Sequence, residues 1–528
     1  MKKIILLFAV GLLFSSCVKD LDVEPLDKDV VTSASVFDDE SSYYQILAKI
    51  YAGLAVSGQN GPSGEVDIYG VDPGYGQYLR ALFYLQEFTT DEAITGWDDQ
   101  TIRDLHYQAW SSSDVFITAM YYRIFYQIGV VNEFLRQTTQ ELLDERGVSE
   151  SMQQTIAVYR AEARFMRALS YYHAIDMFAN VPFVTENDEV GSFFPPQISR
   201  AALFDYIESE LLDIENQMIA PRMNEYGRAD KACVWTLLAK LYLNAEIYTG
   251  IPHYSECVTY SRKVIDAGYS LSPEYQYLFL ADNHYLDEVI FSVNFDGTFT
   301  KSYGGTTFII HAAIGGSINP QEFGVNGGWS GMRSTSALVR KFYPDLKNIN
   351  ETKDKRALFY NEDQTLEIED VGDFNQGWAV TKWKNVDRNG NNGSDLEFAD
   401  TDFPLFRLAD VYLMYAEAVL RGGGGSISDA LDYVNELRYR AYGDNSGDIA
   451  LGDLTLDFIL DERARELYWE MYRRTDLIRF GQFTNGSYVW PWKGRVMEGI
   501  TTSPVYNVFP IPASDLTANP NLKQNIGY

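Results

Sequence analysis

The sequence predicts a mostly helical protein whose helices are interrupted by one loop-rich segment. Apolar residues recur at three-to-four spacing in several long stretches, the pattern of a helix with one buried face. Between about residues 271 and 402 this spacing fades, and Gly, Asn, Asp and aromatic residues crowd together. No stretch resembles a low-complexity linker. We therefore expect a single domain over 41–528, with a helical scaffold at about 41–270 and 403–480 and the loop-rich segment inserted at about 271–402.

The expected helices follow one another along both parts of this scaffold. Periodicity begins near Ser41 and is clearest from Ala157 to Phe178. Further helices are expected at Ala229–Ala245, Leu408–Val419, Ser428–Ala441 and Leu456–Arg479. The helix that ends at Val419 has a firm boundary, because the four glycines of Gly422–Gly425 cannot continue it.

The loop-rich segment is expected to contain short strands and exposed aromatic residues. Val289–Val293 and Thr306–Ile310 have the composition of β-strands. Glycine pairs stand beside aromatic residues in Tyr303-Gly304-Gly305 and in Asn326-Gly327-Gly328-Trp329. Long glycine-rich loops on a helical scaffold are where binding residues usually lie, so we expect a binding site here.

The first sixteen residues have the composition of an export signal. Lys2 and Lys3 precede the apolar run Ile4–Phe14, which is too short to span a bilayer, and small residues precede Cys17. Small residues directly before a lone cysteine resemble a bacterial lipobox, which predicts that Cys17 becomes the acylated first residue of the mature protein. An ordinary secretory signal with an incidental cysteine is the alternative. Residues 1–16 would then be removed, and residues 17–40 would form the lipid anchor and tether.

Charge and composition exclude several classes of partner. The formal net charge is −31, which repels phosphate backbones and argues against nucleic-acid binding. It also argues against a polybasic face docking on a membrane. Aromatic residues make up 14% of the chain and include 37 Tyr, so some rings are expected on the surface. A neutral ligand, or one held by a local arginine, fits this composition best.

The common catalytic and metal-binding patterns are missing from the sequence. It has no G-x-S-x-G elbow, P-loop, dinucleotide glycine fingerprint or H-E-x-x-H, and its five histidines are scattered singly. Acid pairs such as Asp91-Glu92 and Asp98-Asp99 arise by chance among 74 acids. The EF-hand-like stretch from Asn385 has Leu396 where a bidentate Glu is needed, and indicates a polar turn. We expect no catalytic residue, no metal site and no cofactor, with a structural calcium near Asp282 left open.

Two further sets of residues are expected to have structural roles. Cys233 and Cys257, the cysteines of the mature chain, are expected to be buried free thiols, with a disulfide as the alternative. Trp235, Trp490 and Trp492 are expected to pack against the protein and not to bind a ligand.

Several strings occur in a fixed order along the mature chain. They are Arg160–Leu169, Met177–Pro182, Gly227–Ala232, Leu238–Leu243, Phe403–Val411, Tyr415–Ala418, Glu462–Leu467, Arg473–Gly481, Phe509–Pro512 and Asn519–Tyr528. Each string alone is a weak signal. Together they resemble the SusD/RagB family of outer-membrane glycan-binding lipoproteins.

The resemblance implies a fold, a location and a partner. The implied fold is a right-handed scaffold of tetratricopeptide-like helix pairs with the loop-rich segment over it; the sequence itself shows no clean 34-residue repeat. The implied location is the outer face of the outer membrane, and the acidic stretch Val18–Asp22 resembles the signal for it. The implied partner is a SusC-like TonB-dependent transporter, on which such a lipoprotein closes like a lid.

Within the family, the loops resemble those of its starch-binding prototype. Carried over position by position, the sugar-stacking rings would be Trp97, Tyr303 and Trp329. The polar contacts implied beside them are Asp72, Arg80 and Gln100, where Gln100 replaces an expected Asn. Thr95 stands where the prototype has a second tryptophan, so one wall of the site would be thinner.

The physical chemistry of sugars agrees with such a site. Flat rings cover the C–H faces of a pyranose, while Arg, Asp and Gln satisfy its hydroxyl groups. Three rings in a curved row would select a coiled α-1,4-glucan, with each ring contributing on the order of 1–2 kcal/mol. The alternatives are another glycan, such as a β-glucan, or a peptide on the same scaffold, and a secreted glycoside hydrolase whose acids the sequence does not reveal.

Overall fold

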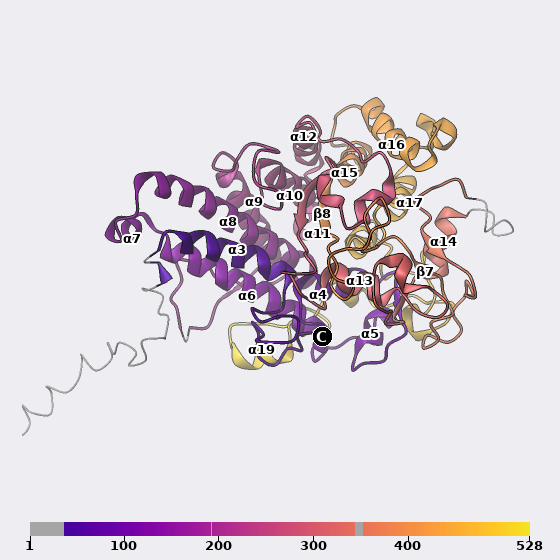
Figure 1. Ribbon diagram of the computed structural model, residues 1–528, viewed down its shortest axis with the longest axis horizontal. Coiled ribbons are helices and arrows are strands. Elements are labelled where there is room, and N and C mark those ends of the chain that lie inside the picture. The colour runs from indigo at the N-terminus through magenta and orange to yellow at the C-terminus, as the bar shows by residue number, and fades with distance from the viewer. Residues whose placement is uncertain (1–35, 38, 192, 344–351) are drawn as a thin grey trace, which may run out of the picture.

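The computed structural model describes residues 36–37, 39–191, 193–343 and 352–528. The export signal, Cys17 and most of the expected tether lie outside these residues. The long helices of the N-terminal part form one side of the molecule, and the loop-rich segment lies on the other side, below the helices of residues 408–467 (Figure 1). The described helices include none that is long and apolar enough to cross a membrane.

The first helical part holds nine helices among the described residues. They are α3 (Ser41–Ala55), α4 (Tyr78–Gln86), α5 (Ile102–Tyr107), α6 (Val115–Gln137), α7 (Gln140–Glu145), α8 (Glu150–Phe178), α9 (Arg200–Ile214), α10 (Lys231–Leu243) and α12 (Tyr254–Ile265), besides the single turn α11 (Ala245–Thr249). Polar side chains cap several of these helices: Asp114 accepts from the backbone at the start of α6, and Ser149 at the start of α8.

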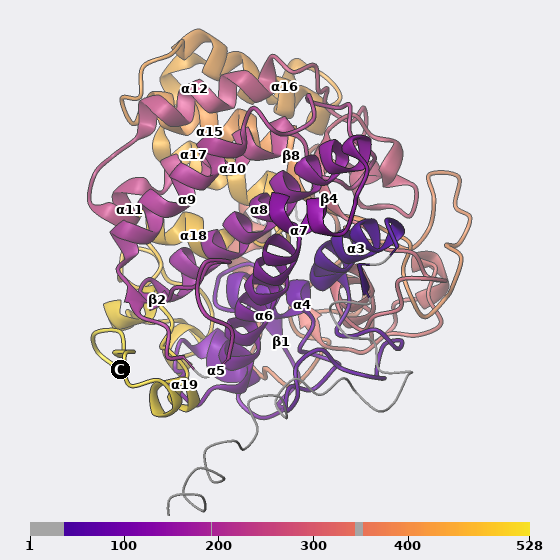
Figure 2. The same ribbon diagram turned by 90° about the vertical axis from the view of Figure 1, so that its left-hand side faces the viewer.

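Consecutive helices pack as pairs along this part. Helix α6 packs on α8, α8 on α9, and α10 on α12, while α3 lies against both α6 and α8. The C-terminal segment with α19 (Ala513–Ala518) returns to the start of α6, where Tyr122 and Ser514 exchange a hydrogen bond of 2.8 Å (Figure 2). Helix α3, near the start of the described chain, and the segment with α19, near its end, therefore both contact helix α6.

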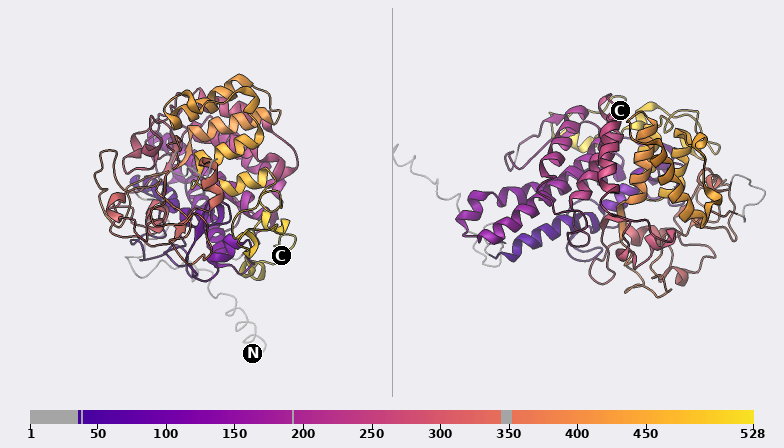
Figure 3. Two further views of the ribbon diagram at one scale, coloured as in Figure 1. Left: turned by 90° about the vertical axis from the view of Figure 1, so that its right-hand side faces the viewer. Right: turned by 90° about the horizontal axis from the view of Figure 1, so that it is seen from above.

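The second helical part follows the loop-rich segment. It comprises strand β8 (Phe403–Arg407) and helices α15 (Leu408–Leu420), α16 (Ile427–Tyr442), α17 (Leu456–Leu467) and α18 (Arg473–Arg479). Helix α15 packs on α12 of the first part as well as on α16 and α17 (Figure 3). The two helical parts, separated by more than a hundred residues in sequence, thus form one continuous scaffold.

Short elements support the loops. The strands are β1 (Ile94–Thr95), β2 (Val181–Pro182), β3 (Gln197–Ile198), β4 (Val289–Val293), β5 (Met332–Arg333), β6 (Phe359–Tyr360) and β7 (Ala379–Val380), and the helices are α13 (Gly305–Ala312) and α14 (Ser336–Phe342). All the pairs, β1–β5, β2–β3, β4–β8 and β6–β7, are antiparallel. The pair β4–β8 joins the loop-rich segment to the second helical part.

The predicted helices are confirmed, with one difference of detail. The stretch predicted as Leu456–Arg479 is two helices, because Trp469 and Met471 adopt positive φ angles of 60° and 68° and break it. Of the two predicted strands, Val289–Val293 is β4, but the prediction of a strand at Thr306–Ile310 is wrong. Those residues form most of α13, which is buried on all sides, and periodicity cannot distinguish a fully buried helix from a buried strand.

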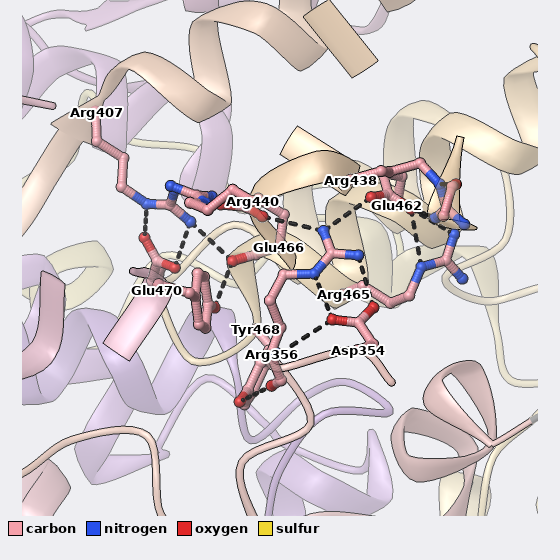
Figure 4. A network of polar contacts seen from close by, with 12 residues as sticks. Asp354, Arg356, Arg407, Arg438, Arg440, Glu462, Arg465, Glu466, Tyr468 and Glu470 are labelled. Carbon is pink, nitrogen blue, oxygen red and sulfur yellow. Dashed lines mark hydrogen bonds and ion pairs between the residues drawn. The ribbon is translucent and has the colours of Figure 1, made fainter. Parts of the chain in front are cut away.

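The strings that carried the family resemblance form a buried ion-pair network. Arg407 of β8 contacts Glu466 and Glu470 at 2.6 Å each, and Arg356 contacts Glu462 and Glu466 at 2.8 and 3.0 Å (Figure 4). All five side chains have no exposed surface. Leaving one such charge unpaired in the interior is costly, and each of these five buried charges has at least one partner of opposite sign. Their role is to join α17 to the loop-rich segment and to β8.

The other structural expectations can be checked directly. Cys233 and Cys257 are buried free thiols, so the alternative of a disulfide is wrong. Trp490 is buried, and Trp492 is half-buried with its Nε1 donating to the Ile368 carbonyl at 2.8 Å, as expected of packing residues. Trp235 is half-buried and donates to Glu215 at 2.8 Å, so it is less enclosed than its apolar helix suggested.

Candidate functional site

The pairing of two short strands brings two of the predicted rings together. Strand β1 pairs with β5, and Gly96 N donates to the Gly331 carbonyl at 2.8 Å just beyond the pair. The next residue, Trp97, lies directly over Gly331, since a Cβ at that glycine would lie 2.3 Å from Trp97 Cζ2. Trp97 Nε1 donates to the Trp329 carbonyl at 3.1 Å. Residues 232 positions apart thereby share one surface.

The third ring is placed by the start of α13. Tyr303 precedes Gly304 and Gly305, and Gly305 has a φ of +52°, which favours glycine. Gly305 N donates to the side chain of Gln77, the residue that caps α4, at 3.0 Å. A side chain at either glycine would collide with Gln77 or Phe295, so the two glycines let the Tyr303 loop lie against α4.

Arg80, on α4, lies at the centre of the three ring-bearing residues. Its guanidinium carbon is 5.8 Å from the ring centre of Trp97 and 5.7 Å from that of Trp329. Its Nη1 donates to the Tyr303 carbonyl at 2.8 Å. With Nε bound to the Tyr84 hydroxyl, Nη2 has no hydrogen-bond acceptor among the described residues, and Arg80 makes no ion pair within them. Arg80 therefore has donors available for a ligand lying on the rings.

Two residues behind the rings hold them in place. The imidazole of His311 stacks on Trp329, with ring centres 4.9 Å apart and planes inclined by 16°. His311 Nδ1 lies 2.6 Å from the Gly327 carbonyl, and its Nε2 lies 2.9 Å from the Glu397 carbonyl. The Glu397 carboxylate accepts a hydrogen bond from the Tyr303 hydroxyl at 2.7 Å, and this bond raises the pKa of Tyr303. Burial lowers the pKa of His311.

The predicted polar residues lie at the edge of this arrangement. Asp72 is exposed, and its Oδ1 accepts from Gly74 N at 2.7 Å, while the Gly74 carbonyl accepts from Arg80 Nη1 at 2.7 Å. Gln100 is exposed with a positive φ of 49°, and its Nε2 lies 3.5 Å from the Tyr75 hydroxyl. Thr95 is fully buried in β1 and adds no surface, in keeping with the thinner wall expected there.

The three rings are half-buried and form an inclined surface. Each presents part of its surface to solvent. The planes of Tyr303 and Trp329 meet at 64° with ring centres 6.2 Å apart, so the surface turns between them. Inclined rings around a cationic donor can stack on successive C–H faces of a chain that curves and can donate to its hydroxyl groups. The predicted site residues are therefore brought together, although nothing in the sequence pointed to His311 or Glu397.

The other candidate groups from the sequence lie elsewhere. Asp91 and Glu92 are buried, and Asp91 pairs with Arg473 at 2.7 Å. Asp282, where a calcium was considered, accepts from Arg388 at 2.6 Å. Asp387 accepts from Asn389 and Asn391 N at 2.8 Å each, which confirms a polar turn in place of an EF-hand loop. No group of three or more His, Cys, Asp or Glu in the described ranges could hold a metal ion.

Fold and site together define a helical scaffold that presents a platform of aromatic rings from its loops. The family model described as SusD family matches residues 348–528. The starch-binding protein SusD of Bacteroides thetaiotaomicron is 35% identical over 97% of this chain and 96% of its own length. SusD-like protein P25 of Formosa agariphila is 26% identical over 98% of both chains. The chain therefore belongs to the SusD family.

Solved structures show the same fold. A SusD superfamily protein from Parabacteroides distasonis has a TM-score of 0.70 at 22% identity and covers 94% of this chain and 100% of its own. Surface glycan-binding protein A from Bacteroides fluxus has a TM-score of 0.70 at 20% identity, covering 93% of this chain and 100% of its own. The predicted fold class, tetratricopeptide-like helix pairs carrying a loop-rich segment, is thereby confirmed.

Proposed function

We propose that this protein captures a starch-like α-1,4-glucan on Trp97, Tyr303 and Trp329 and passes it uncut to a SusC-like TonB-dependent transporter. The observation that carries the proposal is the convergence of the three rings around Arg80, whose Nη2 has no acceptor among the described residues. Rings contribute by covering the apolar faces of glucose units, and Arg80 donates to hydroxyl groups at their rim.

The choice of an α-glucan rests on shape and on similarity. Tyr303 and Trp329 are inclined by 64°, so a chain that follows both must bend, as a coiled α-1,4-glucan does. A straight β-1,4-linked chain would lie on one ring and leave the next. The relative at 35% identity is named a starch-binding protein, which favours the same ligand here. Because each half-buried ring contributes on the order of 1–2 kcal/mol, we expect micromolar to millimolar affinity.

The N-terminal sequence and the family support a proposal for the location. We propose that Cys17 carries acyl chains that hold the protein on the outer face of the outer membrane, with residues 17–40 as anchor and tether. The transporter would receive the glycan directly from the ring platform. Globomycin treatment of cells, which blocks lipoprotein signal cleavage, should leave an unprocessed precursor if Cys17 is acylated, whereas a Cys17→Ser chain should not be lipidated.

Retention of the purified protein in a native gel containing amylopectin tests the ligand. We expect retarded migration with no reducing sugar released. Substituting Trp97, Tyr303 and Trp329 together by Ala should abolish retention while the melting temperature confirms folding. Tyr69→Ala serves as a matched control, because Tyr69 is exposed and lies outside the three rings. Unchanged retention of the triple variant would show that the ring platform is not the site.

A glycoside hydrolase is the alternative from another class. Of the carboxylates near the rings, Glu397 is already bonded to the Tyr303 hydroxyl and Asp72 to Gly74 N, whereas Asp98 and Asp99, which follow Trp97, are exposed; the acid pair Asp91-Glu92 is buried away from solvent. A retaining or inverting hydrolase needs two carboxyl groups facing the same sugar linkage. Release of reducing sugar by the wild-type protein, lost in Glu397→Gln, would favour the hydrolase over a binding protein.

A further inference from the structure

A second cavity, separate from the ring platform, lies where the loop-rich segment begins. Its volume is about 620 Å³, within the range of sites for small organic ligands. One wall is the segment 269–274 and the other is the C-terminal half of α16, and no residue of the ring platform lines it. Tyr412 of α15 and Lys355 complete it.

The apolar part of this cavity is made by tyrosine rings. Tyr439 is 52% exposed and lies on the solvent-facing side of helix α16, as does Glu436. Tyr412 lines the cavity as well, and it stacks on Tyr433 with ring centres 4.4 Å apart. Leu271 and Pro273 face it from the opposite wall. Exposed and stacked tyrosine rings offer flat apolar surface together with hydroxyl groups.

The polar part of the cavity contains a buried donor without a partner. Arg440 lines the cavity but is only 6% exposed. Its Nη1 donates to Glu288 at 2.7 Å and its Nη2 binds Glu466, as part of the network in Figure 4. Its Nε has no hydrogen-bond partner among the described residues. This N–H group is enclosed by protein atoms and does not reach a ligand in the cavity, so the donors that line the cavity are the tyrosine hydroxyls and Lys355.

The charges at the rim indicate what kind of acceptor fits. Glu436 and Glu274 line the cavity, and Glu274 pairs with Lys355 at 3.2 Å. Carboxylates at the rim, and a net charge of −31, disfavour an anionic ligand but accept hydrogen bonds from hydroxyl groups. A ligand with both donors and acceptors and with flat apolar faces satisfies the tyrosine, carboxylate and Lys355 side chains together. Neutral sugars have these properties.

The cavity also has a neighbour, with which it shares one lining residue. Tyr269 lines both this cavity and a second one of about 280 Å³, which contains Tyr226 and Tyr285. Tyr285 is 74% exposed. Two adjoining cavities with a tyrosine at their junction suit a chain of several residues better than a single compact molecule.

We propose that this tyrosine groove, defined by Tyr269, Tyr412, Tyr439 and Arg440, is a second binding site for a neutral oligosaccharide. The groove binds a sugar between Tyr439 and the 271–273 wall, with Glu436 accepting from its hydroxyl groups and Lys355 donating to them. It acts independently of the ring platform, so it would hold a second segment of a polysaccharide while the first is on the rings.

Equilibrium dialysis with a soluble oligosaccharide counts the sites. Binding of maltoheptaose and, in a parallel arm, of cellohexaose is measured for four proteins. These are the wild type, the Trp97/Tyr303/Trp329→Ala triple variant, Tyr439→Ala, and the variant with all four substitutions. We expect the triple variant to retain one site for at least one oligosaccharide, and Tyr439→Ala to weaken that site about tenfold. Tyr69→Ala, which removes an exposed tyrosine that lines neither of the two cavities, is the matched control and should leave the site unchanged.

The outcomes separate this proposal from the proposed function. If the triple variant binds neither oligosaccharide, or if its remaining site is insensitive to Tyr439→Ala, the tyrosine groove is not a saccharide site. Binding of a peptide, but of neither oligosaccharide, by the triple variant would also overturn it. If wild type and triple variant bind maltoheptaose equally through a site that requires Tyr439, the groove stands and the ring platform fails.

Discussion

The carboxylate of Glu397 accepts a hydrogen bond from the Tyr303 hydroxyl at 2.7 Å, and its backbone carbonyl lies 2.9 Å from the imidazole on which Trp329 rests. One residue thus contacts Tyr303 directly and Trp329 through His311. The angle between these two rings, and so the curvature of a bound glycan, depends on a residue outside both glycine-rich loops.

Removing the Glu397 carboxylate should therefore weaken glycan binding without unfolding the protein. In Glu397→Ala the Tyr303 ring loses its partner and regains rotamer freedom that binding must restrict again. We expect affinity for amylopectin to fall by about 1 kcal/mol, or roughly fivefold, measured by retardation in an amylopectin gel. Glu369→Ala, at an exposed acid of the same loop-rich segment, should bind as the wild type does. Equal affinity in both variants would mean that Tyr303 does not need Glu397.

The support beneath Trp329 can be tested by two substitutions of one residue. His311→Ala leaves a void under the indole and removes the one N–H that the neutral imidazole donates to a backbone carbonyl, so we expect about 2 kcal/mol of lost stability and weaker glycan binding. His311→Phe restores the stacked ring but not the N–H group. If stacking positions Trp329, the Phe variant should bind more tightly than the Ala variant although both have lost the polar contacts. Chemical denaturation and gel retardation give the two quantities, and equal binding by both variants would exclude a role for the stack.

A glycine in the Trp329 loop offers a test of how Trp97 is placed. The Cβ of Gly331→Ala would lie 2.3 Å from Trp97 Cζ2, so the indole must move away from its position over the loop. We expect a several-fold loss of glycan affinity and a shift in tryptophan fluorescence. Gly327→Ala is the matched control, because a Cβ there meets nothing within 4 Å. A wild-type affinity for Gly331→Ala would show that the position of Trp97 is not needed for binding.

The helices could be predicted from sequence because their apolar spacing reports a buried face directly. Helix α8 and helix α15 fall where periodicity placed them. Helix α13 could not, because a run such as Thr306–Ile310 that is buried on every side carries no periodicity, and its β-branched residues favour a strand. The break at 469–471 depends on two residues of positive φ held by distant partners: Glu92 accepts from Trp469 N and Glu87 from Met471 N.

The candidate site was predictable only in part, for a similar reason. The three rings were found through the resemblance of short glycine-containing strings, which are local in sequence. His311 and Glu397 are 86 positions apart in sequence. Neither stands in a motif that indicates a binding role, and only the tertiary fold brings them into contact. Among 74 acids, no local signal distinguishes Glu397 from the rest. Strings that contributed to the family resemblance, such as Glu462–Leu467, form interior ion pairs and do not line the ring platform.

One of these interior pairs predicts how stability depends on pH. The Glu417 carboxylate of α15 contacts Arg479 of α18 through two bonds of 2.6 and 2.8 Å and has no exposed surface. Burial opposes its charge, but Arg479 more than compensates and lowers the pKa of Glu417 to about 2. Since the folded pKa lies below the ordinary value near 4.5, the unfolded chain takes up the proton first on acidification. The stabilisation is complete above about pH 4.5 and is lost as the pH falls toward 2.

Glu417→Gln should therefore lose stability at neutral pH and lose less of it in acid. Arg479 would keep Asp476 at 2.8 Å but would lack its main charged partner, so we expect the free energy of unfolding to fall by about 3 kcal/mol near pH 7. The difference in unfolding free energy between the variant and the wild type should shrink as the pH falls to about 3. At that pH the unfolded wild-type chain has already taken up the Glu417 proton, so the ion pair with Arg479 contributes less to stability. Urea unfolding at both pH values measures it, with exposed Asp432→Asn as the control. A difference that stays constant between neutral and acidic pH would show that the ion pair does not stabilise the fold through its charge.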